Sequence, residues 1–87
     1  MEGAVYSVEL MPKVVKDLKK LPKPDAGRII EKIKALQDGL TGDVKRLAAF
    51  VPEYRLRVGN YRVLFEVNGH KITIYHVKHR KEAYLRR

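Results

Sequence analysis

The sequence predicts an α+β fold: an N-terminal strand, a two-helix hairpin and a three-stranded antiparallel meander packed on the helices, followed by a short C-terminal tail or helix. Apolar residues recur at helical spacing between residues 12 and 40, and they alternate with polar residues from residue 53 onwards. Gly59-Asn60 and Asn68-Gly69, pairs typical of two-residue hairpin turns, divide the alternating stretch into three strands. The chain of 87 residues has the size of one small domain, so we expect residues 1–87 to fold as one unit.

The N-terminal half begins with a predicted strand and a short helix. Tyr6, Val8 and Leu10 alternate with polar residues, which is the period of a half-buried strand. Pro12 suits the first turn of a helix, where its missing N–H group costs nothing. The apolar face of this helix consists of Val14, Leu18 and Leu21, and Pro22 and Pro24 are expected to end it.

A second amphipathic helix is predicted to follow. Asp25 is its expected N-cap, and Gly39 is a stop signal at its end. Its apolar stripe consists of Ile29, Ile30, Ile33, Leu36 and Leu40. We assign no regular structure to residues 41–52, where Leu47 and Phe50 are expected to anchor a connecting loop.

Counting outward from the two predicted turns gives the cross-strand partners of the meander. Around Gly59-Asn60, the count places Val58 opposite Tyr61, Arg57 opposite Arg62, Leu56 opposite Val63 and Arg55 opposite Leu64. Around Asn68-Gly69, the same count places Lys71 opposite Glu66, Ile72 opposite Phe65 and Tyr75 opposite Arg62.

The two faces of the predicted sheet differ sharply in polarity. The core face collects Tyr54, Leu56, Val58, Tyr61, Val63, Phe65, Val67, Ile72 and Ile74, and His70 and His76 fall on this side by parity. The other face collects Arg55, Arg57, Arg62, Lys71, Thr73 and Tyr75. Like charges directly opposite on a sheet are destabilising by about 0.2–1 kcal/mol, so Arg57 opposite Arg62 is a cost that folding does not explain. A phosphate held between two guanidinium groups explains it, whereas the alternative reading is a solvated strand face.

The overall charge also indicates a polyanionic partner. Nineteen Lys and Arg against ten Asp and Glu give a formal net charge of +9, which favours nucleic acid over a membrane surface or an acidic protein as the partner. Tyr75 and Tyr84 are placed to stack on bases, whereas Tyr54 and Tyr61 belong to the core.

Other chemistries leave little trace in the sequence. The chain has no cysteine, no glycine-rich phosphate loop and no metal-ligand spacing, and its one serine, Ser7, lies in an ordinary strand pattern. We therefore expect neither a metal nor a cofactor. No apolar run approaches the roughly 18 residues of a membrane span, so we expect no membrane association and a cytoplasmic location.

The run YRLRVGNYRVLFEVNGHKITIYHVKHRKEAY, residues 54–84, closely resembles the C-terminal half of RelE-type toxins of toxin–antitoxin systems, within the RelE/ParE superfamily. The order of the predicted elements matches that family over nearly the whole chain. The resemblance implies a RelE-like, microbial-ribonuclease-like fold and a ribosome-dependent endoribonuclease. Such an enzyme cuts mRNA in the ribosomal A site without metal, through attack of a ribose 2′-hydroxyl on the adjacent phosphate.

The resemblance also implies roles for individual residues. Arg62 matches the arginine that contacts the scissile phosphate, and Arg80 matches a second phosphate-binding arginine. Tyr84 matches a tyrosine that stacks on a base or assists proton transfer. Arg55 and Arg57 stand where some members have lysines, and because arginine does not give up its proton, His79 becomes the hypothesised general base. The candidate catalytic residues are Arg57, Arg62, His79, Arg80 and Tyr84, and the candidate phosphate- and RNA-binding residues are Arg55, Arg57, Lys71 and Tyr75.

Partners and competing functions follow from the same resemblance. A cognate RelB-like antitoxin with acidic residues is expected to wrap the helices and the basic face, and to mask the segment with Tyr84. Operator DNA is expected to be bound only through the toxin–antitoxin complex. Two alternatives remain: a ParE-like inhibitor of DNA gyrase on the same scaffold, and an inactive remnant that only binds an antitoxin.

Overall fold

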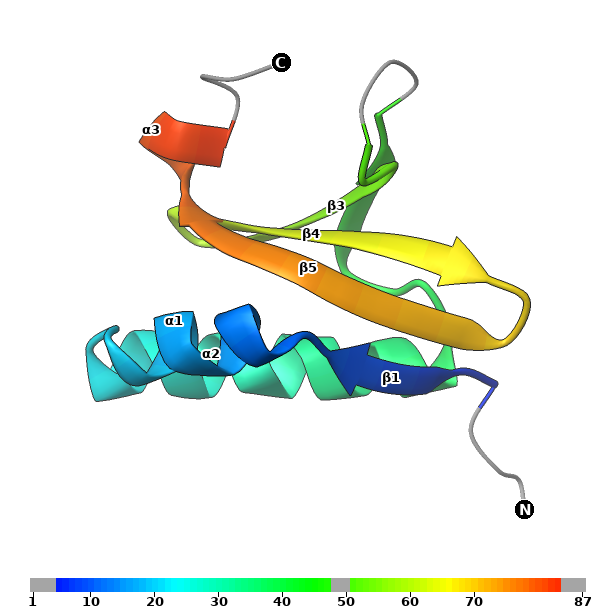
Figure 1. Cartoon of the computed structure of the whole chain (residues 1–87), viewed down its shortest axis with the longest axis horizontal. Coiled ribbons are helices and arrows are strands. Elements are labelled where there is room, and N and C mark those ends of the chain that lie inside the picture. The colour runs from blue at the N-terminus through cyan, green and yellow to red at the C-terminus, as the bar shows by residue number, and fades with distance from the viewer. Residues whose placement is uncertain (1–4, 48–50, 84–87) are drawn as a thin grey trace.

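The computed structural model describes residues 5–47 and 51–83. Their elements are β1 (Ser7–Leu10), α1 (Pro12–Lys19), α2 (Lys23–Ala35), the 3-10 turn η1 (Leu36–Asp38), β2 (Asp43–Arg46), β3 (Tyr54–Val58), β4 (Tyr61–Asn68), β5 (Lys71–His79) and α3 (Arg80–Ala83). In these residues the strands form one five-stranded sheet of order β1-β5-β4-β3-β2. Helices α1 and α2 lie on the same side of β3–β5, and α3 leaves the end of β5 on the other side (Figure 1). The predicted α+β fold is confirmed.

The helix layer has the predicted apolar face with two corrections. Val14 and Leu18 of α1 are buried, as are Ile29, Ile33 and Leu36 of α2 and η1. Ile30, however, is 39% exposed, because consecutive helical residues lie about 100° apart around the axis and Ile29 takes the inward position. The N-cap of α2 is Pro22 and not Asp25. Asp25 lies in the first turn, where its negative charge interacts favourably with the positive end of the helix dipole.

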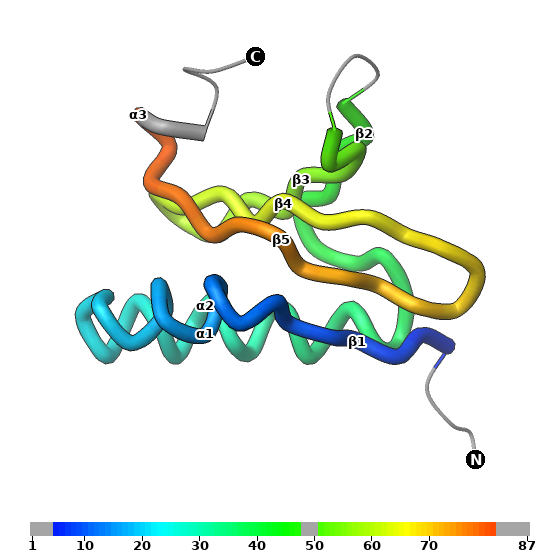
Figure 2. Tube along the Cα trace, in the orientation of Figure 1, coloured from blue at the N-terminus to red at the C-terminus, as the bar shows by residue number. Residues whose placement is uncertain are grey.

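The two edge strands of the sheet go beyond the predicted meander. The loop expected at residues 41–52 contains β2, which pairs antiparallel with β3 and places Val44 opposite Leu56. With one apolar residue in four, β2 has too little alternation to be recognised in the sequence. Leu47 donates its N–H to the Glu53 carbonyl over 2.6 Å, and Phe50 lies outside the described residues. At the other edge β1 runs parallel to β5, which Figure 2 shows between β1 and β4.

The β3–β4 hairpin has the predicted register. Val58 pairs with Tyr61, Arg57 with Arg62 and Leu56 with Val63. Gly59 opens the two-residue turn with φ at +57°, a left-handed conformation that side chains other than glycine rarely adopt. Glycine at the first central position is the signature of a type II′ hairpin turn, whose twist matches that of the strands.

The β4–β5 hairpin differs from the prediction. Its turn is Gly69-His70, so Asn68 pairs with Lys71, and the predicted pairing of Glu66 with Lys71 is wrong. Gly69, at the first central position of the turn, has a positive φ of +62°. Among the described residues, only glycines have positive φ. The register then shifts once more between Leu64 and Phe65, which leaves Tyr75 as an extra residue in β5. Lys78, not Tyr75, is therefore the cross-strand partner of Arg62.

The core lies between the helix layer and the predicted apolar face of the sheet. Leu56, Val58, Val63, Phe65, Ile72 and Ile74 are buried there together with Val14, Leu18, Ile29, Ile33, Leu36 and Val77. The rings of Tyr54 and Phe65 stack with centroids 5.4 Å apart, and Tyr54, Tyr61 and Val67 pack against the cluster. The predicted core face is confirmed for its apolar and tyrosine residues, but not for His70 and His76. Among the described helices, none has the length and apolar content to cross a membrane.

Helix α1 packs alongside the second half of β5. The ammonium group of Lys13 lies 3.4 Å from Nδ1 of the half-buried His76. Partial burial, and then the positive charges of Lys13 and Lys78, lower the pKa of His76 below its ordinary value of 6.5, and the more weakly felt Asp17 opposes them. The imidazole is therefore neutral near pH 7 and accepts a hydrogen bond from the ammonium group.

We expect Gly59→Ala to destabilise the fold by about 1–2 kcal/mol, because alanine pays a steric penalty in the left-handed region. Gly27→Ala is the matched control: Gly27 lies inside α2 with open space around it, so the same change should stabilise the protein by about 0.5–1 kcal/mol. Urea unfolding of both variants measures the two changes. Equal effects would show that the turn does not need glycine.

We also expect stability to fall as the pH drops below about 6.5, in part through His76. Between the lowered pKa of the folded chain and the ordinary value, the unfolded chain binds one more proton at this position, so acidification favours unfolding. Thermal melts at about pH 7.5 and about pH 5.5 should show a smaller loss for His76→Gln than for the unaltered protein. An equal loss in both proteins would contradict this account.

Candidate functional site

Three cations lie in one cross-strand row on the sheet face away from the helices. Arg57 of β3 pairs with Arg62 of β4, and Arg62 pairs with Lys78 of β5. Directly opposite residues of antiparallel strands share a face, with their Cβ atoms about 4.5–5.5 Å apart. We call Arg57, Arg62 and Lys78 the cationic row. Its like charges repel one another, so the row is suited to an anion that bridges them.

The Arg62 side chain is held in place by the turn beside it. Its Nη1 donates to the carbonyl oxygens of Gly59 at 3.1 Å and of Tyr61 at 3.0 Å. Within the described residues, no hydrogen bond engages Nε or Nη2. The half-buried guanidinium is thus fixed at one nitrogen while two others can bind an anion.

Arg80 is tied to the same turn through its backbone. Its N–H donates to the Asn60 carbonyl oxygen over 2.7 Å, which fixes the start of α3 beside the β3–β4 hairpin. The Arg80 residue itself is exposed. The two turn carbonyls, of Gly59 and Asn60, therefore bring together the two arginines that the sequence places 18 positions apart.

Arg57 and Arg55 have different environments although both contact Asp43. Arg57 is 54% exposed, with Nη1 at 3.8 Å from Asp43 Oδ2, and such surface ion pairs contribute little. The Arg55 side chain is only 12% exposed, and its Nη1 lies 3.4 Å from the Asp43 carbonyl and 3.5 Å from Oδ1. Its buried Nε has no partner within the described residues. The Arg55 side chain thus connects β3 to β2, whereas the Arg57 side chain is the one of the two that is presented to solvent.

His79 is not brought together with the cationic row. It pairs with Tyr61, whose side chain lies on the helix side, and the two rings meet edge to face with centroids 5.6 Å apart. Its Nδ1 accepts the N–H of Lys81 over 3.2 Å, which is the contact an N-cap side chain makes with the second residue of a helix.

Tyr61 confirms that this side belongs to the helices. Its hydroxyl donates to Asp25 Oδ2 over 3.3 Å, and Arg28 contacts the other oxygen of the same carboxylate at 2.9 Å. Desolvation and then the Asp25 charge raise the pKa of the Tyr61 phenol, so the hydroxyl stays protonated and keeps donating.

The other predicted residues that the structure describes lie away from the row. Lys71 pairs with Asn68, six residues along β4 from Arg62 and so about 20 Å away, and its ammonium group lies 2.6 Å from Glu9. That hydrogen bond and the Glu9 charge raise the pKa of Lys71. Tyr75 is the half-buried extra residue of β5, and Tyr84 lies outside the described residues. His70 is exposed in a turn and His76 pairs with Leu64, so their predicted core-facing placement is wrong.

Lys78 is the member of the row that sequence reasoning missed. Strict alternation along β5 put Tyr75 opposite Arg62, and the extra residue shifts that position to Lys78. The signal was present: Ile72 and Ile74 are two residues apart, but the next buried residue, Val77, is three further on. A step of three within a period of two marks a bulge. Within residues 5–47 and 51–83, His, Asp and Glu form no cluster of three that would hold a metal ion.

Comparison with known proteins identifies the family. Residues 8–84 match the profile of the family described as "ParE toxin of type II toxin-antitoxin system, parDE". The curated "Toxin RelE3" of Methanocaldococcus jannaschii is 41% identical over 75 residues, which are 80% of this chain and 85% of that protein.

Two solved structures are similar over most of their length. The RelB-RelE antitoxin-toxin complex from Methanococcus jannaschii matches with a TM-score of 0.73 and 38% identity, over 87% of this chain and 94% of the other. The archaeal RelE-RelB complex from Pyrococcus horikoshii OT3 matches with a TM-score of 0.75 and 33% identity, over 91% of this chain and 99% of the other. The sequence, the fold and these relatives together show that the chain belongs to the RelE-type toxins of type II toxin–antitoxin systems.

Proposed function

We propose that this toxin is a metal-independent endoribonuclease that cuts mRNA in the ribosomal A site and so stops translation. The observation that carries the proposal is the cationic row on the sheet face away from the helices, in which the Gly59 carbonyl holds the Arg62 guanidinium and the adjacent Asn60 carbonyl accepts the backbone N–H of Arg80. In the proposed reaction a ribose 2′-hydroxyl attacks the adjacent phosphorus, the bond to the 5′-oxygen breaks, and the products carry a 2′,3′-cyclic phosphate and a 5′-hydroxyl.

The cationic row supplies what this reaction needs most. Negative charge grows on the phosphoryl oxygens as the 2′-oxygen attacks, and donors fixed in advance stabilise it without reorganisation. Arg62 is such a donor, because the Gly59 and Tyr61 carbonyls hold one of its nitrogens. Arg57 and Lys78 flank it on neighbouring strands, and the backbone of Arg80 is tied to the same turn.

The general base stays a hypothesis. His79 is the residue proposed for it, but its Nδ1 accepts the Lys81 N–H and its ring packs on Tyr61 on the helix side. Acting on a ribose at the cationic row requires the ring to leave both contacts. We therefore place most of the catalytic effect on electrostatic stabilisation and on positioning of the mRNA by the ribosome.

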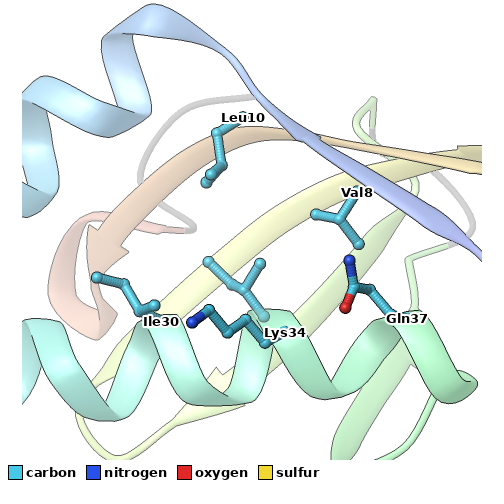
Figure 3. Close-up of a pocket in the computed structure, with 6 residues that line it drawn as sticks. Val8, Leu10, Ile30, Lys34 and Gln37 are labelled. Atoms are coloured by element: carbon cyan, nitrogen blue, oxygen red, sulfur yellow. The ribbon is translucent and has the colours of Figure 1, made fainter. Parts of the chain in front are cut away.

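The partner of the toxin is proposed to be a RelB-like antitoxin, as in the solved complexes of the relatives. A groove between β1 and α2 offers it a docking surface: Val8 and Leu10 face Ile30, Lys34 and Gln37 across a hollow of about 130 Å³ (Figure 3). An adjoining hollow of about 310 Å³ shares Leu10 and Ile30 and is completed by Val15, Leu18 and Lys19. Lys19 and Lys34 beside exposed apolar side chains suit an amphipathic antitoxin helix with acidic flanks. We also propose that operator DNA is bound only by the toxin–antitoxin complex.

A second candidate function is inhibition of DNA gyrase, which the ParE name of the matching family profile favours. The two functions differ in their first effect. The nuclease stops protein synthesis directly, whereas a gyrase inhibitor blocks supercoiling of DNA in a purified reaction. An inactive remnant that only binds antitoxin would do neither, and cells would grow normally when the protein is made alone.

The nuclease is tested by mapping mRNA 5′ ends after the purified chain is added to a reconstituted translation reaction. We expect cuts within the A-site codon, and a rate about 10²–10³-fold lower for Arg62→Ala, as for loss of one preorganised donor. Lys32→Ala is the control, because Lys32 is an exposed cation on α2 that lines none of the three hollows and should leave the rate unchanged. Cleavage of naked mRNA at the same rate, or full activity of Arg62→Ala, would refute the proposal.

Antitoxin docking is tested by calorimetry with the cognate antitoxin. Ile30→Gln should weaken binding at least tenfold, which corresponds to about 1.4 kcal/mol, since a polar amide replaces an apolar side chain shared by both hollows. Val51→Gln is the matched control: Val51 is 91% exposed and lines neither hollow. If both variants bind equally well, the antitoxin does not use this groove.

A further inference from the structure

A second cleft lies on the helix side of β5, apart from the apolar groove. Beyond Ile74, none of the residues that the structure describes forms a strand on the outer side of β5, because β1 ends at Leu10 and the chain continues into α1. Helix α1 lies alongside this part of β5 and leaves a cleft of about 380 Å³. Its lining consists of Lys13, Asp17, Lys20, Leu21, Tyr61, Val77, Lys78 and His79, and we call it the lysine cleft.

The lysine cleft carries an excess of positive charge. Lys13 and Lys20 of α1 line it against the single carboxylate of Asp17, while Lys78, a member of the cationic row, borders it from β5. The carboxylate nearest to Tyr61 is that of Asp25, and it is already engaged by the Tyr61 hydroxyl and by Arg28. The lysines are thus left with one competing anion within the lining, and a negatively charged ligand is favoured there.

Two aromatic rings form part of the same lining. Tyr61 and His79 meet at 79° with their centroids 5.6 Å apart, so their faces point in different directions. The contacts of Tyr61 with Asp25 and of His79 with the Lys81 N–H hold both rings in place. Fixed rings beside cationic side chains are the combination that binds single-stranded nucleic acid, because bases stack on the rings while phosphates pair with the cations.

Lys78 connects the lysine cleft to the cationic row. It lines the cleft, and it is also the cross-strand partner of Arg62. An RNA strand with one phosphate at Arg62 therefore reaches the edge of β5 at Lys78, where the cleft begins. Without the extra residue Tyr75, this edge position would not stand opposite Arg62.

We propose that the lysine cleft binds the nucleotide next to the cleaved phosphodiester, with its phosphate at Lys13 and Lys20 and its base against the Tyr61 and His79 rings. This inference rests on the proposed nuclease function and adds a second subsite to it. An acidic peptide would also meet the lysines, but the paired rings and the continuity with the cationic row favour RNA. His79 then acts on the substrate as a stacking surface on the helix side of the sheet, in place of the general-base role.

The test measures binding of a fluorescent single-stranded RNA oligonucleotide at several salt concentrations. The double variant Lys13→Gln/Lys20→Gln should bind at least tenfold more weakly, and the slope of log affinity against log salt should fall by about 0.7 for each lost phosphate contact. Lys23→Gln/Lys32→Gln is the matched control, because it removes the same charge from exposed positions of α2 outside the cleft. Lys13→Arg/Lys20→Arg should restore binding, and thermal melts check that each variant is folded.

The outcomes separate the cleft from the nuclease function. Equal losses in the two glutamine variants would show a diffuse charge effect and overturn the inference. Unchanged RNA binding with weakened antitoxin binding would make the cleft a protein site and also overturn it. If the unaltered toxin cuts mRNA in an Arg62-dependent way while Lys13→Gln/Lys20→Gln binds RNA normally, the cleft fails and the nuclease stands. If RNA binding depends on Lys13 and Lys20 but no mRNA is cut, the cleft stands and the nuclease fails.

Discussion

The two-residue turn between β3 and β4 is the constraint on which the rest of the site depends. Glycine at position 59 allows the left-handed backbone that closes the hairpin in a single register, and this register sets Arg57 opposite Arg62. The same turn presents two carbonyl oxygens outward. The Gly59 carbonyl accepts a hydrogen bond from the Arg62 guanidinium, and the Asn60 carbonyl accepts one from the Arg80 N–H. The conformation of the turn therefore positions the Arg62 side chain and the Arg80 backbone.

The extra residue in β5 is the second determinant of the site. A bulge leaves one residue unpaired and moves all later residues of the strand by one position relative to the partner strand. Here it brings Lys78 opposite Arg62 and turns His79 toward Tyr61 and the helices. Positive charge thus continues from the sheet face to the edge of β5, where α1 adds Lys13 and Lys20.

The arginines near β2 show why residue type alone does not assign function. Arg55 and Arg57 are two residues apart on one strand and share Asp43, yet one is nearly buried and the other is half exposed. The edge strand β2 makes this difference, since its backbone carbonyl and carboxylate take up the Arg55 guanidinium. The Arg55 guanidinium is thus already engaged at the sheet edge, whereas Arg57 remains open to a ligand.

The sequence by itself determined the helix layer, the core face and the β3–β4 register, because these depend on local periodicity and on one glycine-containing turn. It also indicated the charged face, through the arginines between Tyr54 and Arg62, and the family, through the run of residues 54–84. Only the tertiary structure decided the edge strands, the second hairpin register, and the sides on which Lys78 and His79 lie. A strand of four residues carries too little pattern, and a single bulge reverses the face of every later residue, so these features depend on pairing across the sheet and not on the order of residues along the chain.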